Sequence, residues 1–437
     1  MATRRQIIFF NICLAFGVLV LVLQFVYTKR SSVVESPSTQ DYGSAPYFTD
    51  DGAAWLDSWR QASPNVYIFS AYLDSRLGPN KTTIRVIGAV RQRPELKVTY
   101  SCLVDDDTKK RTRPIVAKMI ILQEHHHHKF TGVFFLCPYS WDPSSAAPRT
   151  VRLGVSGAEF GTSQSVSIHN RPTTEHLADN SLALCVRPFY DGVPKLHDLV
   201  HFVAYYSTHG VRRFTFYDND TRPEVKDYLR TLSKHLQVDL ISWNSPTTKL
   251  SWALYQNAFT QDCLYRHMHA SKYVLIVDLD EFVFPFPKRD KPTRLVDILP
   301  YLQKSRSCFL FRNVFWIREA SSEDEPFIFK SVQRSKRVWP PMLRSKYVAR
   351  VRDVVEGGIH YCIKYLDSLG KNRHSVVGSA HMFHYKQKRT EQYTKDHVML
   401  VWQESVMKSP IMRAYLSPST EPPGLLEELK QFMRFAW

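Results

Sequence analysis

The pattern of hydrophobic and polar positions changes partway along the chain. Between residues 62 and 170, short runs rich in β-branched and aromatic residues are separated by Gly, Pro and Asn. Such punctuation predicts strands and turns rather than helices. The runs expected to form strands are residues 67–72, 83–90, 96–100, 114–122, 132–136 and 150–155. We interpret residues 62–170 as a small β-sandwich-like accessory domain.

From residue 182 onward, apolar runs of strand length alternate with helical stretches, which is typical of an α/β layer with a mainly parallel sheet. The expected strands are residues 182–186, 213–217, 238–243 and 272–277. The expected helices between them are residues 196–209, 225–235 and 252–269. Neither a G-x-G-x-x-G nor a P-loop motif occurs at the turns, so a nicotinamide cofactor or a P-loop NTPase is disfavoured. Residues 180–437 are therefore assigned to a Rossmann-like catalytic domain.

The hydrophobic run at residues 7–27 carries no charge, and only Asn11 and Gln24 are strongly polar. As a helix it would span about 31 Å, which matches the core of a bilayer and predicts a transmembrane signal anchor. A cleaved signal peptide is the alternative, but residues 26–30 offer no small-x-small cleavage site. Residues 1–6 would then be a cytoplasmic tail, and residues 28–61, rich in Ser and Pro at first, a stem.

The net charge bears on the partners of the chain, and the glycosylation triplets and cysteines bear on its cellular compartment. The net charge of +17 would suit an anionic partner, but the basic residues are dispersed and no nucleic-acid-binding module is recognisable. The triplets that begin at Asn80 and Asn219 are N-glycosylation acceptors if they are luminal. Outside the anchor, which holds Cys13, six cysteines remain, compatible with an oxidising compartment.

Two acids follow the last predicted strand of the α/β layer. Asp278 and Asp280 stand two residues apart, so both carboxylates can point to one side and reach one ion. Carboxylate oxygens suit Mn²⁺ or Mg²⁺, which can in turn bind a substrate diphosphate. Glu281 is expected to face the other way or to support the site from behind.

A histidine late in the domain could complete a metal site. His384 is the first choice, with His381 and His360 as alternatives. Two more obvious clusters, residues 105–107 (three Asp) and 125–128 (four His), are poorer candidates. Consecutive residues on a strand point to opposite faces and cannot converge on one ion, so exposed loops are expected there.

Five short motifs occur in an order that resembles glycosyltransferase family 92, over residues 182–386. They are LCVRP at 184–188, FYDN at 216–219, QDC at 261–263, DLDEF at 278–282 and HY at 384–385. The resemblance implies a GT-A fold and a single-pass type II Golgi membrane enzyme. It further implies transfer of galactose from UDP-galactose in β linkage, with β-1,4 expected, to glycan termini with Mn²⁺.

The resemblance also suggests roles for individual residues. Asp278 and Asp280 would bind the metal and the diphosphate, with His384 as the late ligand. Asp218 and Asn219, after the second strand of the layer, would meet the uridine. A nucleotide contact at Asn219 would leave Asn80 as the better glycan acceptor.

Other candidates keep two readings. Arg187, after the first strand, is either a nucleotide contact or half of a structural ion pair. Gln256 and Asn257 either border the donor sugar or form the polar surface of their helix. Asp262 and Arg266 are spaced for an i,i+4 ion pair on that helix.

A β product from an α-linked donor requires inversion, and inversion requires a base for the acceptor hydroxyl. Asp353 and Glu356 lie downstream of the metal motif, and the sequence does not choose between them. Lys346, Arg350 and Arg352 nearby either contact phosphate or acceptor or belong to an exposed basic loop.

Two rival functions use the same residues. A metal-dependent phosphoester hydrolase or nucleotidyltransferase would need more converging acids or a second metal. A catalytically silent Golgi glycan-binding protein would not need the intact acids and histidine. The expected partners are a UDP-sugar donor, a glycan acceptor and the membrane, without nucleic acid, and a homodimer is compatible with the sequence.

Overall fold

The computed structural model describes residues 57–93, 97–105, 113–158, 160, 165–170, 181–233, 236–288, 291–366, 369–370, 373–387 and 390–416. All of these fall in one compact unit, Pro46–Trp437. The predicted tail, the anchor and the stem up to residue 56 lie outside the described residues. Among the helices that are described, none combines the length and the apolar character that crossing a bilayer requires.

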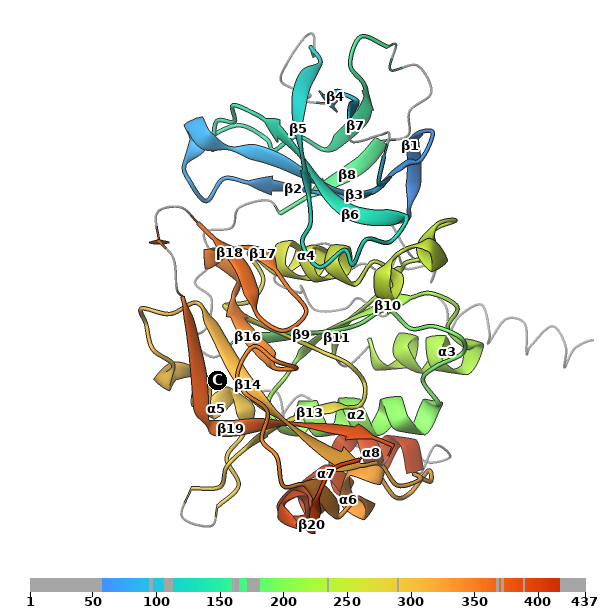
Figure 1. Ribbon diagram of the computed structural model, residues 1–437, viewed down its shortest axis with the longest axis vertical. Coiled ribbons are helices and arrows are strands. Elements are labelled where there is room, and N and C mark those ends of the chain that lie inside the picture. Colours follow the sequence, from blue (N-terminus) through green and yellow to red (C-terminus); the bar gives the residue numbers. More distant parts are fainter. Residues whose placement is uncertain are drawn as a thin grey trace, which may run out of the picture. The chain divides into compact units, whose positions relative to one another are not determined.

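The first eight strands form a single sheet that closes on itself (Figure 1). They are β1 Arg60–Ser63, β2 Val66–Asp74, β3 Thr83–Arg91, β4 Tyr100–Asp105, β5 Ile115–Ile121, β6 Phe130–Pro138, β7 Thr150–Val155 and β8 Ser165–His169. Their order is β1-β2-β3-β6-β5-β4-β7-β8, and β8 pairs back with β2. The predicted two-sheet sandwich is therefore not confirmed, because the strands close into one barrel around an apolar interior.

The α/β layer follows the barrel. It contains β9 Leu182–Val186, α2 Leu196–Thr208, β10 Arg213–Asp218, α3 Pro223–Leu232, β11 Gln237–Ser242, α4 Gln256–Arg266 and β12 Tyr273–Val277. The four strands are parallel in the order β11-β10-β9-β12. This confirms the predicted α/β layer, and the order reverses between β9 and β12, where such sheets bind ligands.

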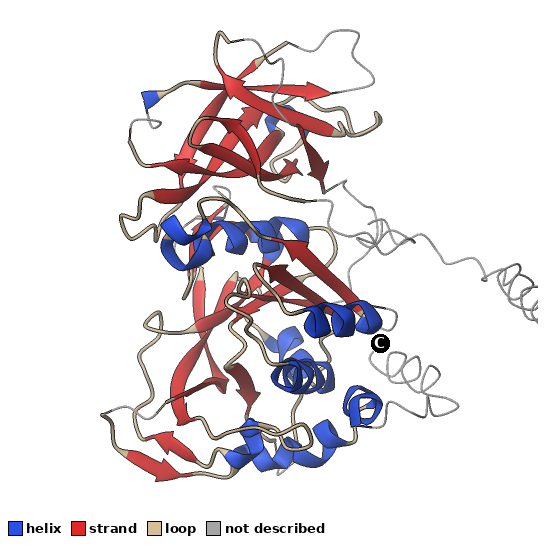
Figure 2. Ribbon diagram, turned by 90° about the vertical axis from the view of Figure 1, so that its right-hand side faces the viewer, coloured by secondary structure: helices blue, strands red, loops and turns tan. Residues whose placement is uncertain are grey.

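Mostly antiparallel strands, with one parallel pair among those described, extend the sheet beyond β12 (Figure 2). These are β13 Glu281–Pro285, β14 Cys308–Ile317, β15 Gln333–Ser335, β16 Lys346–Arg350, β19 His374–Lys386 and β20 Tyr393–Lys395, with β17 Val354–Gly357 and β18 Cys362–Tyr365 as a separate hairpin. β16 pairs with β12 and β14, while β19 pairs with β13 and β14. Short α-helices complete the domain: α5 Leu295–Ile298, α6 Phe327–Lys330, α7 Gln403–Met407 and α8 Pro410–Leu416.

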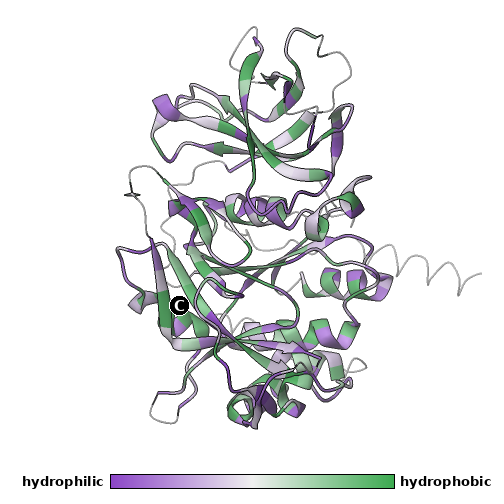
Figure 3. Cartoon of the chain, viewed as in Figure 1, coloured by the Kyte–Doolittle hydropathy of each residue, from purple (hydrophilic) through white to green (hydrophobic). Residues whose placement is uncertain are grey.

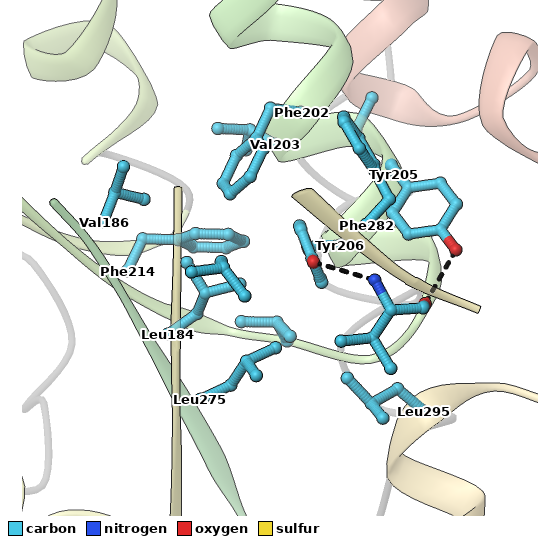
Figure 4. Packing of buried hydrophobic residues seen from close by; sticks show 14 of the residues in the cluster. Leu184, Val186, Phe202, Val203, Tyr205, Tyr206, Phe214, Leu275, Phe282 and Leu295 are labelled. Carbon is cyan, nitrogen blue, oxygen red and sulfur yellow. Dashed lines mark hydrogen bonds between the residues drawn. The ribbon is translucent and has the colours of Figure 1, made fainter. Parts of the chain in front are cut away.

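Helix α2 packs its apolar side on one face of the sheet and holds β13 in place (Figure 4). The Tyr205 hydroxyl donates to the Val283 carbonyl at 2.8 Å, and the Tyr206 hydroxyl donates to the Glu281 carbonyl at 2.9 Å. The Val283 amide donates to the Tyr206 oxygen at 3.1 Å. These buried hydroxyls are satisfied by the backbone of β13, so they fix the strand that begins with Glu281.

Helix α4 is buried along its whole length between the barrel and the sheet, although it carries many polar residues (Figure 3). The Asp262 carboxylate accepts hydrogen bonds from Ser70 and Tyr72 of the barrel and from Tyr217 of β10. Its ion pair with Arg266, 3.0 Å long, confirms the predicted i,i+4 pair. A fully buried carboxylate of this kind is tolerated because its oxygens are paired.

The predicted helix 252–269 starts later than the sequence suggested. A 3-10 turn, η4 Trp252–Leu254, comes first, and Ala253, Leu254 and Tyr255 take positive φ angles of 42°, 59° and 60°. The α-helix begins only at Gln256 because the left-handed Tyr255 interrupts the helical hydrogen bonding. The remaining 3-10 turns are η1 Pro79–Lys81, η3 Thr248–Leu250, η5 Leu299–Tyr301, η6 Val351–Asp353 and η8 Val398–Trp402.

All six cysteines of the described residues are paired. The disulfides are Cys102–Cys137 within the barrel, Cys185–Cys263 between β9 and α4, and Cys308–Cys362 between β14 and β18. Disulfides are expected in an oxidising compartment and are rare in the cytosol.

Candidate functional site

The site begins where strands β9 and β12 end at the same edge of the sheet. The two strands are parallel, with Val277 beside Val186, so Arg187 and Asp278 follow at the same level. The Arg187 amide donates to the Val277 carbonyl at 3.4 Å. This edge is the point at which the strand order reverses, so the predicted acids stand where a ligand is expected.

The turn from Asp278 to Glu281 is fixed by its own hydrogen bonds. The Asp278 amide donates to Glu281 Oε2 at 2.9 Å, and the Glu281 amide donates to the Asp278 carbonyl at 3.1 Å. The Asp280 carbonyl accepts from the Tyr385 amide of β19 at 2.9 Å. Glu281 therefore turns back to support the turn, as one of its two predicted placements required.

Strand β19 brings two more side chains to the turn. Its antiparallel pairing with β13 sets Glu281 opposite His384. His384 Nε2 lies 3.6 Å from Asp280 Oδ2, and His384 Nδ1 lies 3.4 Å from Glu281 Oε1. Lys386, two residues further along the same face, places its Nζ 2.6 Å from Asp280 Oδ2. The structure thus brings together Asp280 and His384, which the sequence separates by about a hundred positions.

Strand β16 contributes a buried cation. Lys346 Nζ lies 3.6 Å from Asp278 Oδ2 and 3.2 Å from Glu281 Oε2, and its side chain is only 2% exposed. The sequence had offered Lys346 only as a phosphate or acceptor contact or as part of an exposed loop. Its pairing with the acids depends on the antiparallel placement of β16 beside β12, which no sequence pattern revealed.

Burial and charge act against each other on the ionisable groups. Burial raises the pKa of the Asp278 carboxyl, but the positive charges of Lys346 and Arg187 outweigh burial, so this pKa lies below its usual range. Burial raises the pKa of Glu281 above its usual value despite Lys346. Burial lowers the pKa of Lys346, but the nearby carboxylates of Asp278 and Glu281 have the larger effect. The pKa of Lys346 therefore lies above its usual value, and the ammonium stays charged.

The second acid is held as a carboxylate. Burial raises the pKa of Asp280, but the neighbouring imidazole of His384 and the ammonium of Lys386 bring it well below its usual range. Both acids of the Asp-x-Asp motif are therefore ionised at neutral pH, as a metal ligand must be.

The donor atoms present fit a divalent cation. Within the described part of the chain, Asp278 Oδ1 and both ring nitrogens of His384 are buried and have no hydrogen-bond partner. Carboxylate and imidazole donors suit Mn²⁺. Buried polar atoms without a partner carry a desolvation cost that an added ligand would relieve.

The described atoms do not, however, form a finished cage. The only described trio of His, Cys, Asp or Glu donors within 4.8 Å of one another is Cys185, Cys263 and His267. That trio is no metal site, because its two cysteines are joined in a disulfide. At the sheet edge the carboxylates of Asp278 and Asp280 are instead paired with lysines.

The predicted uridine contacts lie at the same edge of the sheet. Asp218 ends β10, and it is buried with both carboxylate oxygens engaged. Oδ1 accepts from the Thr221 amide at 2.9 Å, and Oδ2 pairs with Lys226 at 2.7 Å. Asn219 follows it and is half-buried. Asp218 therefore has structural partners, and Asn219 is the less occupied of the two.

Gln256 and Asn257 open helix α4, and both are buried. Asn257 Nδ2 donates to the Gln123 carbonyl at 3.2 Å and contacts Thr131 Oγ1 at 3.5 Å. Those partners belong to the barrel, so the Asn257 amide serves the contact between barrel and helix. Neither residue forms the polar surface of a helix, which was the alternative reading.

The structure places Asp353, one of the two predicted bases, away from the turn. Strand β16 runs antiparallel to β12, so Arg350 pairs with Tyr273 at the end of β12 far from Asp278. Asp353 lies beyond this point and accepts a hydrogen bond from Ser307 Oγ at 2.7 Å. The antiparallel return carries the chain to the opposite edge of the sheet, a strand length away from the turn.

Glu356 is also unsuited to act as the base. It is 1% exposed, its Oε1 accepts from the Gln123 amide at 2.8 Å, and its Oε2 pairs with Lys364. The carboxylate therefore holds the β17–β18 hairpin against the barrel. His381, an alternative late ligand, stands three residues before His384 on β19 and so points to the opposite face of the strand.

Comparisons with known proteins place the chain. No curated protein matches it. Among solved structures, TarS of S. aureus (residues 1–349) with UDP-GlcNAc is 11% identical over 58% of this chain and 70% of its own, with a TM-score of 0.28. HddC from Yersinia pseudotuberculosis is 12% identical over 52% of this chain and 99% of its own, with a TM-score of 0.23. Likenesses this weak carry no argument.

The family comparison is stronger than the structural ones. The model of glycosyltransferase family 92 matches residues 180–423, which is more than half of the chain and contains every residue of the sheet-edge turn. The chain belongs to glycosyltransferase family 92.

Proposed function

We propose that this glycosyltransferase moves galactose from UDP-galactose, with inversion and in β linkage, to a terminal sugar of a glycoprotein glycan in the presence of Mn²⁺ or Mg²⁺. One observation carries the metal-dependent part: Asp278, Asp280 and His384 gather at the sheet edge, with buried donor atoms that have no partner among the described residues. The ordered family motifs support galactose and the β-1,4 linkage.

The residues around the turn suit an anionic donor. A cation held by Asp278, Asp280 and His384 would neutralise the diphosphate as the anomeric bond breaks. Arg187, after β9, adds a positive charge beside Asp278. Lys386 is 39% exposed, so its side chain can leave Asp280 and turn to a phosphate. Positive groups fixed before the donor arrives stabilise the leaving group without reorganising.

The rival functions gain no support from a particular observation. A hydrolase or nucleotidyltransferase using two metals would need further converging acids, and the acids Asp353 and Glu356 are committed elsewhere. A silent glycan-binding protein gives no reason for the buried, partnerless donors of Asp278 and His384.

The proposed location is the Golgi membrane, in the single-pass type II orientation with the catalytic domain in the lumen. Three disulfides support an oxidising compartment. Asn80 is exposed in η1 and is open to a glycan. The apolar run at residues 7–27 would supply the anchor.

Calorimetric titration of the full-length chain with UDP, with and without Mn²⁺, tests the proposal. We expect binding that requires Mn²⁺, loss of that binding in Asp280→Ala, and unchanged binding in Asp227→Ala, an exposed acid that pairs only with Arg230. A screen of UDP-sugars for turnover then identifies the donor. Metal-independent UDP binding, or full binding by Asp280→Ala, would contradict the metal site.

A further inference from the structure

A cavity of about 380 Å³ opens in the α/β domain, ahead of strand β16. The residues that line it are Trp339, Met342, Leu343, Arg344 and His360. Most of them come from residues 336–345, the connection between β15 and β16, which we call the 336–345 loop. Its volume falls within the range of small-molecule sites, and its lining is mainly apolar, with Arg344 and His360 as the polar side chains.

Two short routes join this cavity to the turn. Trp339 packs edge-to-face on Phe315 at 5.9 Å between ring centroids, and Phe315 packs against His384 at 5.2 Å. On the other side, the loop leads directly into Lys346, whose Nζ lies 3.6 Å from Asp278. A sugar in the cavity would therefore lie beside a donor bound at the turn.

His360 lines the cavity, and one of its ring nitrogens carries no hydrogen. Its Nδ1 lies 3.0 Å from the Ser345 carbonyl, which can only accept, so Nδ1 must carry the hydrogen. In the neutral ring the lone pair then resides on Nε2. No hydrogen-bond partner for Nε2 occurs among the described residues. A backbone carbonyl that fixes the tautomer in this way leaves the other nitrogen ready to take a proton.

The charges around the ring keep it neutral. Burial lowers the pKa of His360, and the positive charges of Lys346 and Arg344 act in the same direction. The Ser345 carbonyl and Asp278 oppose them only in part, so the pKa falls to about 4. A bound diphosphate would add negative charge beside Lys346 and move this pKa upward. At neutral pH the ring is therefore unprotonated, as a base must be before it accepts a proton.

We propose that His360 is the general base of the transfer and that this cavity holds the acceptor sugar; the inference rests on the inverting reaction proposed above. The acceptor hydroxyl oxygen attacks the anomeric carbon, and its proton passes to His360 Nε2. The bond from that carbon to the phosphate oxygen breaks, and its electron pair leaves with UDP. The products are the new glycoside, UDP and an imidazolium that returns its proton to water.

The barrel holds the segment that carries His360. Glu124, in the turn between β5 and β6, accepts a hydrogen bond from the Ile359 amide through Oε2 at 2.6 Å. A Cβ at Gly358 would lie 2.8 Å from that same oxygen and 2.8 Å from the Tyr361 carbonyl, so only glycine fits this approach. Glu124 is a positioning residue, and the barrel takes part in building the acceptor side of the site.

Kinetics of His360→Ala and His360→Gln test the assignment. We expect galactose transfer to oligosaccharides ending in galactose, N-acetylglucosamine or mannose to fall about 100-fold or more, as for loss of a general base. Acceptor-free hydrolysis of UDP-galactose, in which water replaces the acceptor, should fall with it. Mn²⁺-dependent UDP binding should be unchanged, and His397→Gln, an exposed histidine, should behave as wild type.

The outcomes separate the two proposals. If the wild-type chain neither binds UDP with Mn²⁺ nor turns over a UDP-sugar, the proposed function is wrong, and the assignment of His360 as the base is wrong as well. An active wild type whose His360 variants keep activity within threefold overturns the base alone.

Glu124 variants distinguish positioning from chemistry. The amide of Glu124→Gln can still accept from Ile359, so we expect near-normal kcat, whereas Glu124→Ala should lower kcat and leave Mn²⁺-dependent UDP binding intact. If Glu124→Gln is as inactive as His360→Ala, the carboxylate itself is the base and the assignment to His360 is wrong.

Discussion

At the scale of single residues, Lys346 is the side chain on which the buried acids depend. Its ammonium lies between Asp278 and Glu281, and all three are shielded from bulk water to a large extent. Removing one partner of a buried charge pair costs about 3–5 kcal/mol, because the remaining charge is left without compensation.

We therefore expect Lys346→Met to lower the melting temperature markedly in metal-free buffer. Added Mn²⁺ should raise the melting temperature of Lys346→Met more than that of the wild type, because the cation replaces the lost positive charge. Lys408→Met is the matched control, since Lys408 is exposed and pairs only with Glu404 on the surface. If Mn²⁺ shifts the melting temperature of neither the wild type nor Lys346→Met, no cation binds beside Asp278.

The sequence identified the acids of the site but not the cations that surround them. Asp278 and Asp280 could be found because an apolar strand ends directly before them. The carboxylate pairing of Lys346 and Lys386 depends on which strands lie side by side, and pairing across a hundred residues leaves no local pattern. For the same reason the sequence offered Asp353 as a candidate base, although β16 carries the chain to the opposite edge of the sheet before Asp353.

At the scale of elements, the end of α2 is built around a neutral histidine. His209 is fully buried, stacks between Tyr205 and Trp402, and accepts the Leu295 amide through Nδ1 at 3.2 Å. Burial, with a smaller effect of the Arg294 charge, lowers the pKa of His209 to about 3.

This pKa makes the stability of the domain depend on pH. The unfolded chain takes up the proton near pH 6.5 and the folded chain only near pH 3, so stability is complete above 6.5 and falls as the pH drops through that window. Between pH 7 and pH 5, the wild type should lose about 2 kcal/mol more than His209→Gln, measured by urea unfolding at both values. Equal losses in the two proteins would mean that His209 is protonated in the fold.

Helices and strands were more predictable than their edges. The apolar runs located every strand from β9 to β12, because buried parallel strands are continuous hydrophobic segments. The start of α4 was missed, since three non-glycine residues, Ala253, Leu254 and Tyr255, adopt left-handed angles that their side chains do not favour. Packing around the buried Tyr255, and not local preference, sets that conformation.

At the scale of the whole molecule, Asp262 joins the barrel to the α/β layer. Its carboxylate binds Ser70 and Tyr72 on one side and Tyr217 and Arg266 on the other. The two domains share the apolar cluster around α4 as well. They should therefore unfold together.

Calorimetry of Asp262→Ala tests this coupling. We expect a single transition in the wild type and a loss of about 3–5 kcal/mol in the variant, because Arg266 loses a buried partner. Glu404→Ala, at an exposed surface pair, should leave the unfolding free energy nearly unchanged. Two separate transitions in the wild type would show that the barrel folds independently.

Barrel closure was beyond the reach of the sequence. The apolar runs located β2, β3, β5, β6 and β7, but they missed β1 and β8 and reached only the first residue of β4. The pairing of β8 with β2 joins positions about a hundred residues apart. Alternation within a strand shows which side chains point inward, and it does not show whether the partner strand belongs to the same sheet.

The 336–345 loop leaves β15 at Ser335 and enters β16 at Lys346, two strands of the same sheet, and it forms no strand of its own. Its length and side chains can thus diverge while the strand register, and with it the nucleotide end of the enzyme, stays the same. Duplicated copies of such a gene could acquire new glycan acceptors by changes confined to residues 336–345, while their donor-binding residues stay unchanged.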